Sequence, residues 1–168
     1  MNKLILKINL KNIAVAFGIA IFFMADRGLK VLAQNLDPGT YFRLVGDWFL
    51  FRFTPNPYIS FSLPFSGILL NITILLIIIG LIYYIFYLIL NKKNQSLTIS
   101  ERKITIIILT IILFGAISNI LDRLIYGYVI DYLELKYFTV FNIGDIMISG
   151  GVLVLLFNNL KKDKIEKK

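Results

Sequence analysis

The chain has 168 residues, of which 58% are hydrophobic and only 17% are charged, and its mean hydropathy is +0.78. A soluble domain of this length could not bury so much apolar surface, so the composition predicts one integral membrane domain over residues 1–168. Cysteine and histidine are both absent. Their absence excludes cysteine nucleophiles, Ser-His triads, disulfides and metal sites built on these residues, and we expect no metal and no cofactor.

The net charge is +8, and most of the 18 Lys and Arg residues lie in the N-terminal tail, in the 91–103 loop and in the C-terminal tail. Basic segments that flank apolar runs are typical of cytoplasmic loops in membrane proteins. This distribution therefore favours a multi-pass protein with both termini in the cytoplasm. It argues against nucleic acid as a partner, because the basic charge follows the membrane flanks.

Four apolar runs have the length of a membrane helix, at about 13–33, 68–90, 104–121 and 141–160. About 20 helical residues are needed to cross roughly 30 Å of hydrocarbon. The pattern predicts a mostly α fold, a bundle of four transmembrane helices. With the termini inside, the first and third helices run outward and the other two run inward.

A segment at about 40–64, between the first two helices, has the pattern of strands. Phe49, Phe51 and Phe53 alternate with other residues, which is typical of a strand with one buried face. Pro55-Asn-Pro57 predicts a turn, and Tyr58 to Leu63 is expected to return as a second strand. We therefore expect a small extracytoplasmic β-sheet at the membrane interface.

Polar residues that are costly at membrane depth gather at the outer ends of these helices. An ionisable group there is a functional candidate by default, because burying it in lipid is expensive. The candidates from four separate segments are Asp26 and Lys30, then Asn119, Asp122 and Arg123, then Asp131, and finally Asn142 and Asp145.

Asp131 and Asp145 are the strongest candidates for chemistry. Two carboxylates in one place can share a proton, which is the electrostatic basis of aspartic-protease catalysis. The alternative is that each aspartate caps a helix, since carboxylates are favoured at helix N-termini. Capping accounts for Asp145, at the start of the fourth apolar run, better than for Asp131.

Other interpretations stay open for the remaining polar residues. Asp26 and Lys30 are spaced i,i+4 and are expected to pair, but Lys30 could instead act as general base for Ser118, Ser60 or Ser62. Asp122 beside Arg123 is interpreted as the end of the third helix, and Arg123 could hold a carboxylate or a substrate carbonyl. For the whole protein, an ion or proton carrier or channel, or a non-enzymatic scaffold, are the alternatives to a protease.

Three successive blocks resemble the signature of the lipoprotein signal peptidase (signal peptidase II) family. They are Gly115-Ala-Ile-Ser-Asn119-Ile-Leu-Asp122-Arg123, Gly127-Tyr-Val-Ile-Asp131-Tyr and Val140-Phe-Asn142-Ile-Gly-Asp145. Asp26-Arg-Gly-Leu-Lys30 is similar to the family's first helix, and Asn56 to Ser62 is similar to its outer Asn-x-Gly-x-x-Phe element. The chain departs from the family at Tyr58, which stands at a Gly position, at Ser118, where Gly is usual, and at Gly144, where Ala is usual.

The resemblance implies a membrane aspartic endopeptidase that cleaves bacterial prolipoproteins before a diacylglyceryl-modified cysteine. It implies that Asp131 and Asp145 are the catalytic dyad and that Asn56, Asn119, Arg123, Asn142, Asp26 and Lys30 shape or support the site, with Asp122 as a further supporting residue. The expected location is the bacterial cytoplasmic (inner) membrane with the site near the outer leaflet. The expected partners are the prolipoprotein substrate and membrane lipid, and the protein is expected to be a monomer.

Overall fold

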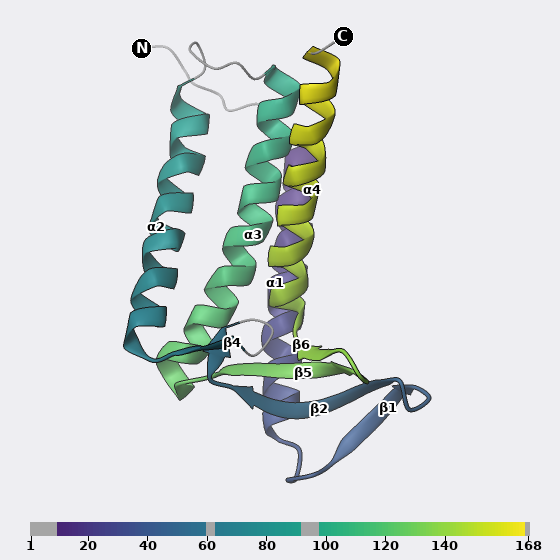
Figure 1. The fold of residues 1–168 in the computed structure, drawn as a ribbon. Coiled ribbons are helices and arrows are strands. Elements are labelled where there is room, and N and C mark those ends of the chain that lie inside the picture. Colours follow the sequence, from purple (N-terminus) through teal and green to yellow (C-terminus); the bar gives the residue numbers. More distant parts are fainter. Residues whose placement is uncertain (1–9, 60–62, 92–97, 167–168) are drawn as a thin grey trace.

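Four long helices stand side by side in the computed structural model, with small antiparallel sheets at one end (Figure 1). The structure describes residues 10–59, 63–91 and 98–166. The helices are α1 (Leu10–Gln34), α2 (Ile68–Leu90), α3 (Ile99–Tyr126) and α4 (Ile143–Glu166). The first residue of α1 and the last of α4 lie at the end of the bundle opposite the sheets. The predicted mostly helical fold with a small antiparallel sheet is confirmed.

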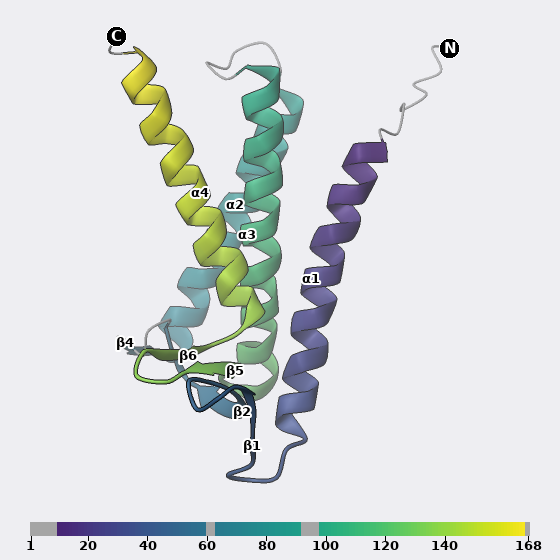
Figure 2. The same ribbon diagram turned by 90° about the vertical axis from the view of Figure 1, so that its right-hand side faces the viewer.

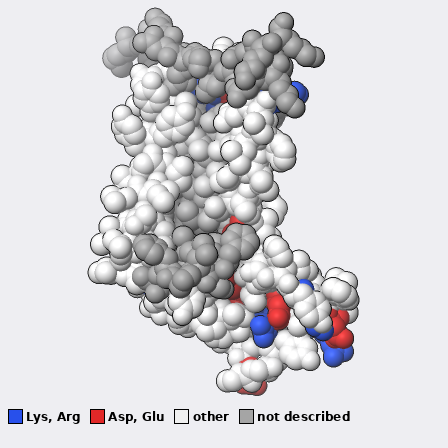
Figure 3. Space-filling view, viewed as in Figure 1, with Lys and Arg blue, Asp and Glu red and all other residues white. Residues whose placement is uncertain are grey.

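Among the described residues, three helical stretches are long and apolar enough to cross a membrane: Ile68–Leu90, Ile99–Tyr126 and Ile143–Lys161. Figure 3 shows one face of the bundle almost free of charged residues, while charged side chains gather over the sheet. A surface of this kind is stable against lipid rather than against water. The helix α1 carries Asp26, Arg27 and Lys30 in its second half, and its crossing of the membrane remains a prediction.

The helix α3 extends beyond the predicted run 104–121 at both ends. Thr98 caps its first turn: the Thr98 hydroxyl accepts from the Glu101 N–H at 3.2 Å and the Glu101 carboxylate accepts from the Thr98 N–H at 2.7 Å. Gly127 ends it in the left-handed conformation, with φ 83°. The predicted range was too short because it was based on hydropathy, and charged residues lie inside both ends of the helix. The predicted bounds of the second helix, 68–90, are those of α2.

The main sheet contains four strands in the order β1-β2-β5-β6, and each strand is antiparallel to its neighbour. The strands are β1 (Tyr41–Val45), β2 (Phe49–Asn56), β5 (Val129–Leu135) and β6 (Thr139–Phe141). The prediction placed the sheet wholly within 40–64, and that was incomplete, since half of its strands come from the connection between α3 and α4. Asp131 therefore lies on a strand and not in a loop.

The prediction of a turn at Pro55-Asn-Pro57, with Tyr58 to Leu63 returning as a second strand beside the first, was wrong. The strand β2 continues through Asn56, which pairs with Val129 of β5. After it, β3 (Tyr58–Ile59) pairs with β4 (Leu63–Ser66) in a separate two-stranded sheet; residues 60–62 of the expected strand lie outside the described residues. Prolines suit this end of β2 because the register shifts between Phe51 and Thr54. The result is that Asn56 lies beside the strand that carries Asp131.

The helices α3 and α4 approach each other closely where glycines face one another. A Cβ added at Gly115 would lie 2.5 Å from the backbone oxygen of Gly144, and one at Gly151 would lie 2.5 Å from Ile112. Small residues at such positions let helix backbones pack in contact. This packing fixes the first turn of α4, and with it Asp145, against the side chains at the end of α3 nearest the sheet.

Candidate active site

Asp131 lies at the centre of β5, with only 1% of its surface exposed. Each of its carboxylate oxygens accepts a hydrogen bond from an amide: Nδ2 of Asn56 lies 2.8 Å from Oδ2, and Nδ2 of Asn142 lies 2.6 Å from Oδ1. The pairing of β2 with β5 brings Asn56 to this position. The buried carboxyl group is therefore held in one orientation by side chains from two distant segments.

Asp145 lies in the first turn of α4 and forms a capping box with Asn142. The backbone N–H of Asp145 donates to Oδ1 of Asn142 at 2.9 Å, and Oδ2 of Asp145 accepts from the backbone N–H of Asn142 at 3.3 Å. The capping interpretation is thus confirmed for Asp145. Its other oxygen, Oδ1, does not face the helix end; it accepts from Nδ2 of Asn119 at 2.8 Å.

Asn142 joins the two aspartates, because its side chain donates to Asp131 while its backbone donates to Asp145. The two carboxylates thus bind the same residue, and the sharing of a proton between them stays a prediction. The pKa of Asp131 is raised to about 7 from a usual 3.8. Burial is the largest cause and the charge of Asp145 acts in the same direction, while the amides of Asn56 and Asn142 and the Lys30 cation act in the opposite direction. One carboxyl of a pair in this state can be neutral near pH 7.

A second polar cluster lies behind the pair and is fully buried. Nζ of Lys30 lies 3.1 Å from Oδ2 of Asp26 and 2.8 Å from Oδ2 of Asp122. The predicted pairing of Asp26 with Lys30 is confirmed. The interpretation of Asp122 as an exposed helix end was wrong: α3 continues to Tyr126, and Asp122 also pairs with Arg27 and accepts from the backbone N–H of Ile130 at 3.2 Å.

The second cluster contacts the start of α4 directly. Oδ1 of Asp26 accepts from the Tyr132 hydroxyl at 2.8 Å and from the Gly144 N–H at 3.1 Å. The Tyr132 hydroxyl in turn accepts from the Ile143 N–H at 3.1 Å. Free N–H groups at the start of a helix need acceptors, and these two side chains provide them. Asp26 thus positions the turn that carries Asp145.

Sequence reasoning missed two members of this arrangement, Arg27 and Tyr132. Arg27 had a usable signal, since a third charge in an apolar run needs a buried partner of opposite sign. Tyr132 had a weaker one: it follows Asp131 directly, but its side chain points to the opposite face of the strand, where it is fully buried among Ala33, Ile130 and Phe51.

The Ser-Lys alternative is not supported at Ser118. Its Oγ lies 3.3 Å from Nζ of Lys30, which is hydrogen-bond contact. However, both side chains are fully buried, and the Ser118 hydroxyl donates to Asp26. A nucleophile must reach a substrate carbonyl, and neither atom is accessible. Ser60 and Ser62, the other two candidates, lie outside the described residues.

Arg123 lies near the pair but hydrogen-bonds to neither aspartate in the described part of the chain. Its Nη2 donates to the backbone oxygen of Tyr58 at 2.7 Å, and 8% of the residue is exposed. The contact fixes the segment that follows Asn56. The Tyr58 N–H also donates to Oδ1 of Asn56 at 3.0 Å, so Arg123 helps to hold Asn56 against Asp131.

Two adjacent hollows open beside the acidic pair. One, of about 510 Å³, contains Asp131, and the other, of about 350 Å³, contains Asp145 and the outward-facing residues of the first turns of α4. Both are lined by Asn56, Phe138, Thr139 and Val140. The two hollows adjoin along these four residues, three of which surround the start of β6, and we refer to the two hollows together as the groove.

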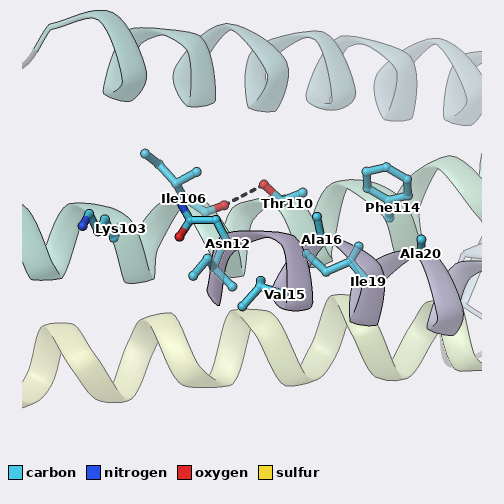
Figure 4. A pocket seen from close by; sticks show the side chains of 10 residues that line it. Asn12, Val15, Ala16, Ile19, Ala20, Lys103, Ile106, Thr110 and Phe114 are labelled. Carbon is cyan, nitrogen blue, oxygen red and sulfur yellow. Dashed lines mark hydrogen bonds between the residues drawn. The ribbon is translucent and has the colours of Figure 1, made fainter. Parts of the chain in front are cut away.

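A further hollow, of about 360 Å³, lies between α1 and α3 away from this groove (Figure 4). No carboxylate is found among the described residues that line it. Its walls are mostly apolar, with Asn12, Lys103 and Thr110 as the polar lining residues, and the Thr110 hydroxyl donates to the Ile106 carbonyl of its own helix at 2.7 Å. This hollow lacks the paired acid and base that hydrolysis needs.

Comparison with known proteins identifies relatives over most of the chain. Residues 18–161 match the family described as signal peptidase (SPase) II. A lipoprotein signal peptidase of Clostridium tetani is 32% identical over 88% of this chain and 93% of its own length, and one of Chlorobaculum parvum is 33% identical over 82% and 89%. A solved structure described as a bacterial membrane enzyme superposes with a TM-score of 0.73 at 19% identity, over 92% of both chains. That last likeness is one of fold.

Proposed function

The chain belongs to the signal peptidase II family, and from this membership and the geometry of its acidic pair we propose that it is an aspartic endopeptidase. The substrate is a bacterial prolipoprotein, cleaved before a diacylglyceryl-modified cysteine. Asp131 and Asp145 are the proposed catalytic residues. The observation that carries the proposal is that Asn142 binds both carboxylates at once, at the wall of an open groove.

In the proposed mechanism the pair holds one proton. Two like charges near each other disfavour double ionisation, so the proton belongs to the pair rather than to one residue. The charged carboxylate takes a proton from a water molecule as the water oxygen attacks the scissile carbonyl carbon. The neutral carboxyl donates a hydrogen bond to the carbonyl oxygen, and a proton then passes to the leaving amine as the C–N bond breaks.

The surrounding amides keep this pair in a reactive arrangement. Asn56 and Asn142 occupy both oxygens of Asp131, and Asn119 fixes Asp145. Donors held in place before the reaction stabilise developing charge without reorganising. Asp26, Lys30 and Asp122 act through these amides and through the start of α4, and they are positioning residues rather than catalytic ones.

We propose that α1 is a fourth transmembrane helix and that both termini lie in the cytoplasm of a bacterial inner-membrane protein. The pairing of Lys30 with Asp26 and Asp122 lowers the cost of these charges within the bilayer. In this orientation the sheet and the acidic pair lie at the outer surface. That is the side on which the lipid-modified end of an exported precursor would be presented.

The alternative function, an ion or proton carrier or channel, is less well supported than a protease. A relay needs ionisable groups distributed across the membrane depth. The buried ionisable groups among the described residues are Asp26, Lys30, Asp122, Arg123 and Asp131. These groups are connected to one another or to the sheet by the contacts above, so they form one site at one end of the bundle.

The direct test uses purified protein in lipid vesicles with two forms of one precursor, one carrying the diacylglyceryl group on its cysteine and one unmodified. We expect the modified form to be shortened at the bond before that cysteine and the unmodified form to remain intact. Failure to process the modified precursor would contradict the proposal. Equal cleavage of both forms would keep the protease but contradict its substrate class.

A further inference from the structure

The strand β6 is the outermost strand of the main sheet on the side of the groove. The sheet order β1-β2-β5-β6 leaves one edge of β6 without a partner strand in the described part of the chain. Figure 2 shows β6 as the strand next to the start of α4. The backbone N–H and C=O groups on such an edge can pair with another extended chain.

The turn between β5 and β6 determines which residue of β6 presents these groups. The Phe138 N–H donates to the Leu135 carbonyl at 2.9 Å, Tyr137 has φ 67°, and Leu135 pairs with Thr139. The Lys136 N–H donates to the Trp48 carbonyl at 2.9 Å, on the β2 side of β5, so Leu135, the residue before it, directs its backbone groups to β6. Alternate residues of an antiparallel strand direct their backbone groups to the partner. Thr139 and Phe141 therefore face β5, and Val140 directs its N–H and C=O outward.

Val140 lies beside both hollows of the acidic pair. Val140 lines the hollow that contains Asp131 and also the hollow that contains Asp145. Its carbonyl accepts from the Thr139 hydroxyl at 3.2 Å, which leaves one lone pair of that oxygen for another donor. Val140 is half-buried, as are the other two residues of β6, so part of the residue is open to solvent.

We propose that the substrate binds as an added strand on β6, paired through the backbone N–H and C=O of Val140, and that this pairing places the scissile bond between Asp131 and Asp145. The proposal rests on the proposed function. Backbone pairing recognises an extended polypeptide of any sequence, which suits an enzyme whose precursors differ in sequence. Specificity then comes from groups other than the main chain, while Val140 sets the register.

The first test removes the outward N–H by Val140→Pro. Proline is compatible with an edge strand where the lost N–H does not belong to the ladder. Loss of one hydrogen bond is expected to raise KM roughly 3- to 10-fold, with kcat reduced as the register loosens. Val140→Ala keeps the N–H and shortens only the side chain, so it separates the contribution of the backbone N–H from that of the side chain. Circular dichroism and thermal unfolding of both variants report whether the sheet remains intact.

The second test leaves the enzyme unchanged and scans the substrate. Single amide-to-ester replacements in the lipid-modified precursor, at positions flanking but not including the scissile bond, each remove one N–H donor. We expect one replacement to raise KM through loss of the bond to the Val140 carbonyl. That penalty should persist with Val140→Ala and become smaller with Val140→Pro. Proline keeps the carbonyl, but loss of the N–H bond loosens the register in which the substrate N–H meets that carbonyl.

If no ester replacement raised the KM of the wild-type enzyme, the proposal would be overturned, even if Val140→Pro failed to fold. An ester penalty of the same size in a folded Val140→Pro variant would overturn it too. In both cases the wild-type enzyme still cleaves the lipid-modified precursor that contains no ester replacement, and the proposed function stands. Absence of cleavage of that amide precursor would instead contradict the proposed function itself.

Discussion

Nζ of Lys30 lies 2.8 Å from Oδ1 of Asn119 in the buried part of the bundle next to the sheet. A lysine ammonium is a donor only, so the Asn119 amide must turn its oxygen to Lys30 and its nitrogen to Asp145, where Nδ2 donates at 2.8 Å. The orientation of an amide that contacts the acidic pair is therefore set by a cation on another helix. The second cluster is thus coupled to the chemistry without touching a substrate.

Lys30→Met is expected to lower both stability and turnover. It leaves Asp26 and Asp122 buried without their shared cation, and breaking such a buried pair costs about 3–5 kcal/mol. Chemical denaturation in detergent measures the loss. Arg43→Met is the matched control, because Arg43 pairs with Asp47 at the exposed surface. We expect that control to change stability by less than about 1 kcal/mol. Equal effects of the two substitutions would contradict this role for Lys30.

Ser118→Ala distinguishes catalysis by the carboxylate pair from catalysis by a Ser-Lys mechanism. The hydroxyl of Ser118 donates to Asp26 and is fully buried, so its removal costs a hydrogen bond of roughly 1 kcal/mol and not the reaction. Cleavage of the lipid-modified precursor should continue at a rate within about tenfold of the wild type, a range equivalent to ~1.4 kcal/mol. A complete loss of cleavage in a folded Ser118→Ala protein would return Ser118 to the mechanism.

The rate of cleavage should fall as pH rises above about 7. Burial and the charge of Asp145 raise the pKa of Asp131 to about 7, so above that pH the pair becomes doubly charged and no acid remains to polarise the carbonyl. A pH profile of kcat/KM with the modified precursor measures this limb. A rate that is constant from pH 6 to 9 would show that the pair does not lose its shared proton in this range.

The same titration affects stability. The pKa of Asp131 is 3.8 in its usual state and about 7 in the folded protein, so the folded state holds the proton more tightly. The stabilising contribution of this carboxyl is complete below pH 3.8 and is lost as pH rises to about 7. The Asp131→Asn variant has no titrating carboxyl group at this position. The difference in unfolding free energy between the variant and the wild type should therefore grow in favour of the variant from pH 4 to pH 7, as measured by denaturation.

Gly115→Ala should displace Asp145, although Gly115 is not a member of the polar cluster. Its new Cβ would lie 2.5 Å from the Gly144 backbone oxygen, and the first turn of α4 must move to admit it. Overpacking of this kind costs about 1–3 kcal/mol, and the shift should lengthen the Asn119–Asp145 contact and reduce kcat. Gly80→Ala is the control, since nothing lies within 4 Å of its added Cβ. A tolerated Gly115→Ala with normal kcat would contradict the close packing.

The sequence predicted the helices and the acidic pair because both leave local signals. Long apolar runs identified the helices, and charges such as Asp145 and Lys30 stood out within them. The pairing of β2 with β5 left no such signal, since the two strands are far apart in the chain and Asp131 interrupts the apolar pattern of β5. For the same reason the sequence placed Asn56 in a turn, whereas its position beside Asp131 depends on that pairing.

Asp122 shows why the environment of a charge is harder to predict than its presence. An Asp-Arg pair at the end of an apolar run is usually a signal of the membrane surface. Here α3 continues to Tyr126, and the side chain of Asp122 turns inward to Lys30 and Arg27. The partners that make this burial possible come from α1, and only the packing of α1 against α3 brings them there.

Cleavage of the diacylglyceryl-modified precursor by Asp131→Asn and Asp145→Asn tests the central claim most directly. Both variants should retain helical content and bind the precursor, and each should lose turnover by on the order of 10³-fold or more, because one member cannot act as both base and acid. Gly80→Ala, at a position with open space around it, should cleave normally. Substantial turnover by either asparagine variant would contradict the assignment of the pair.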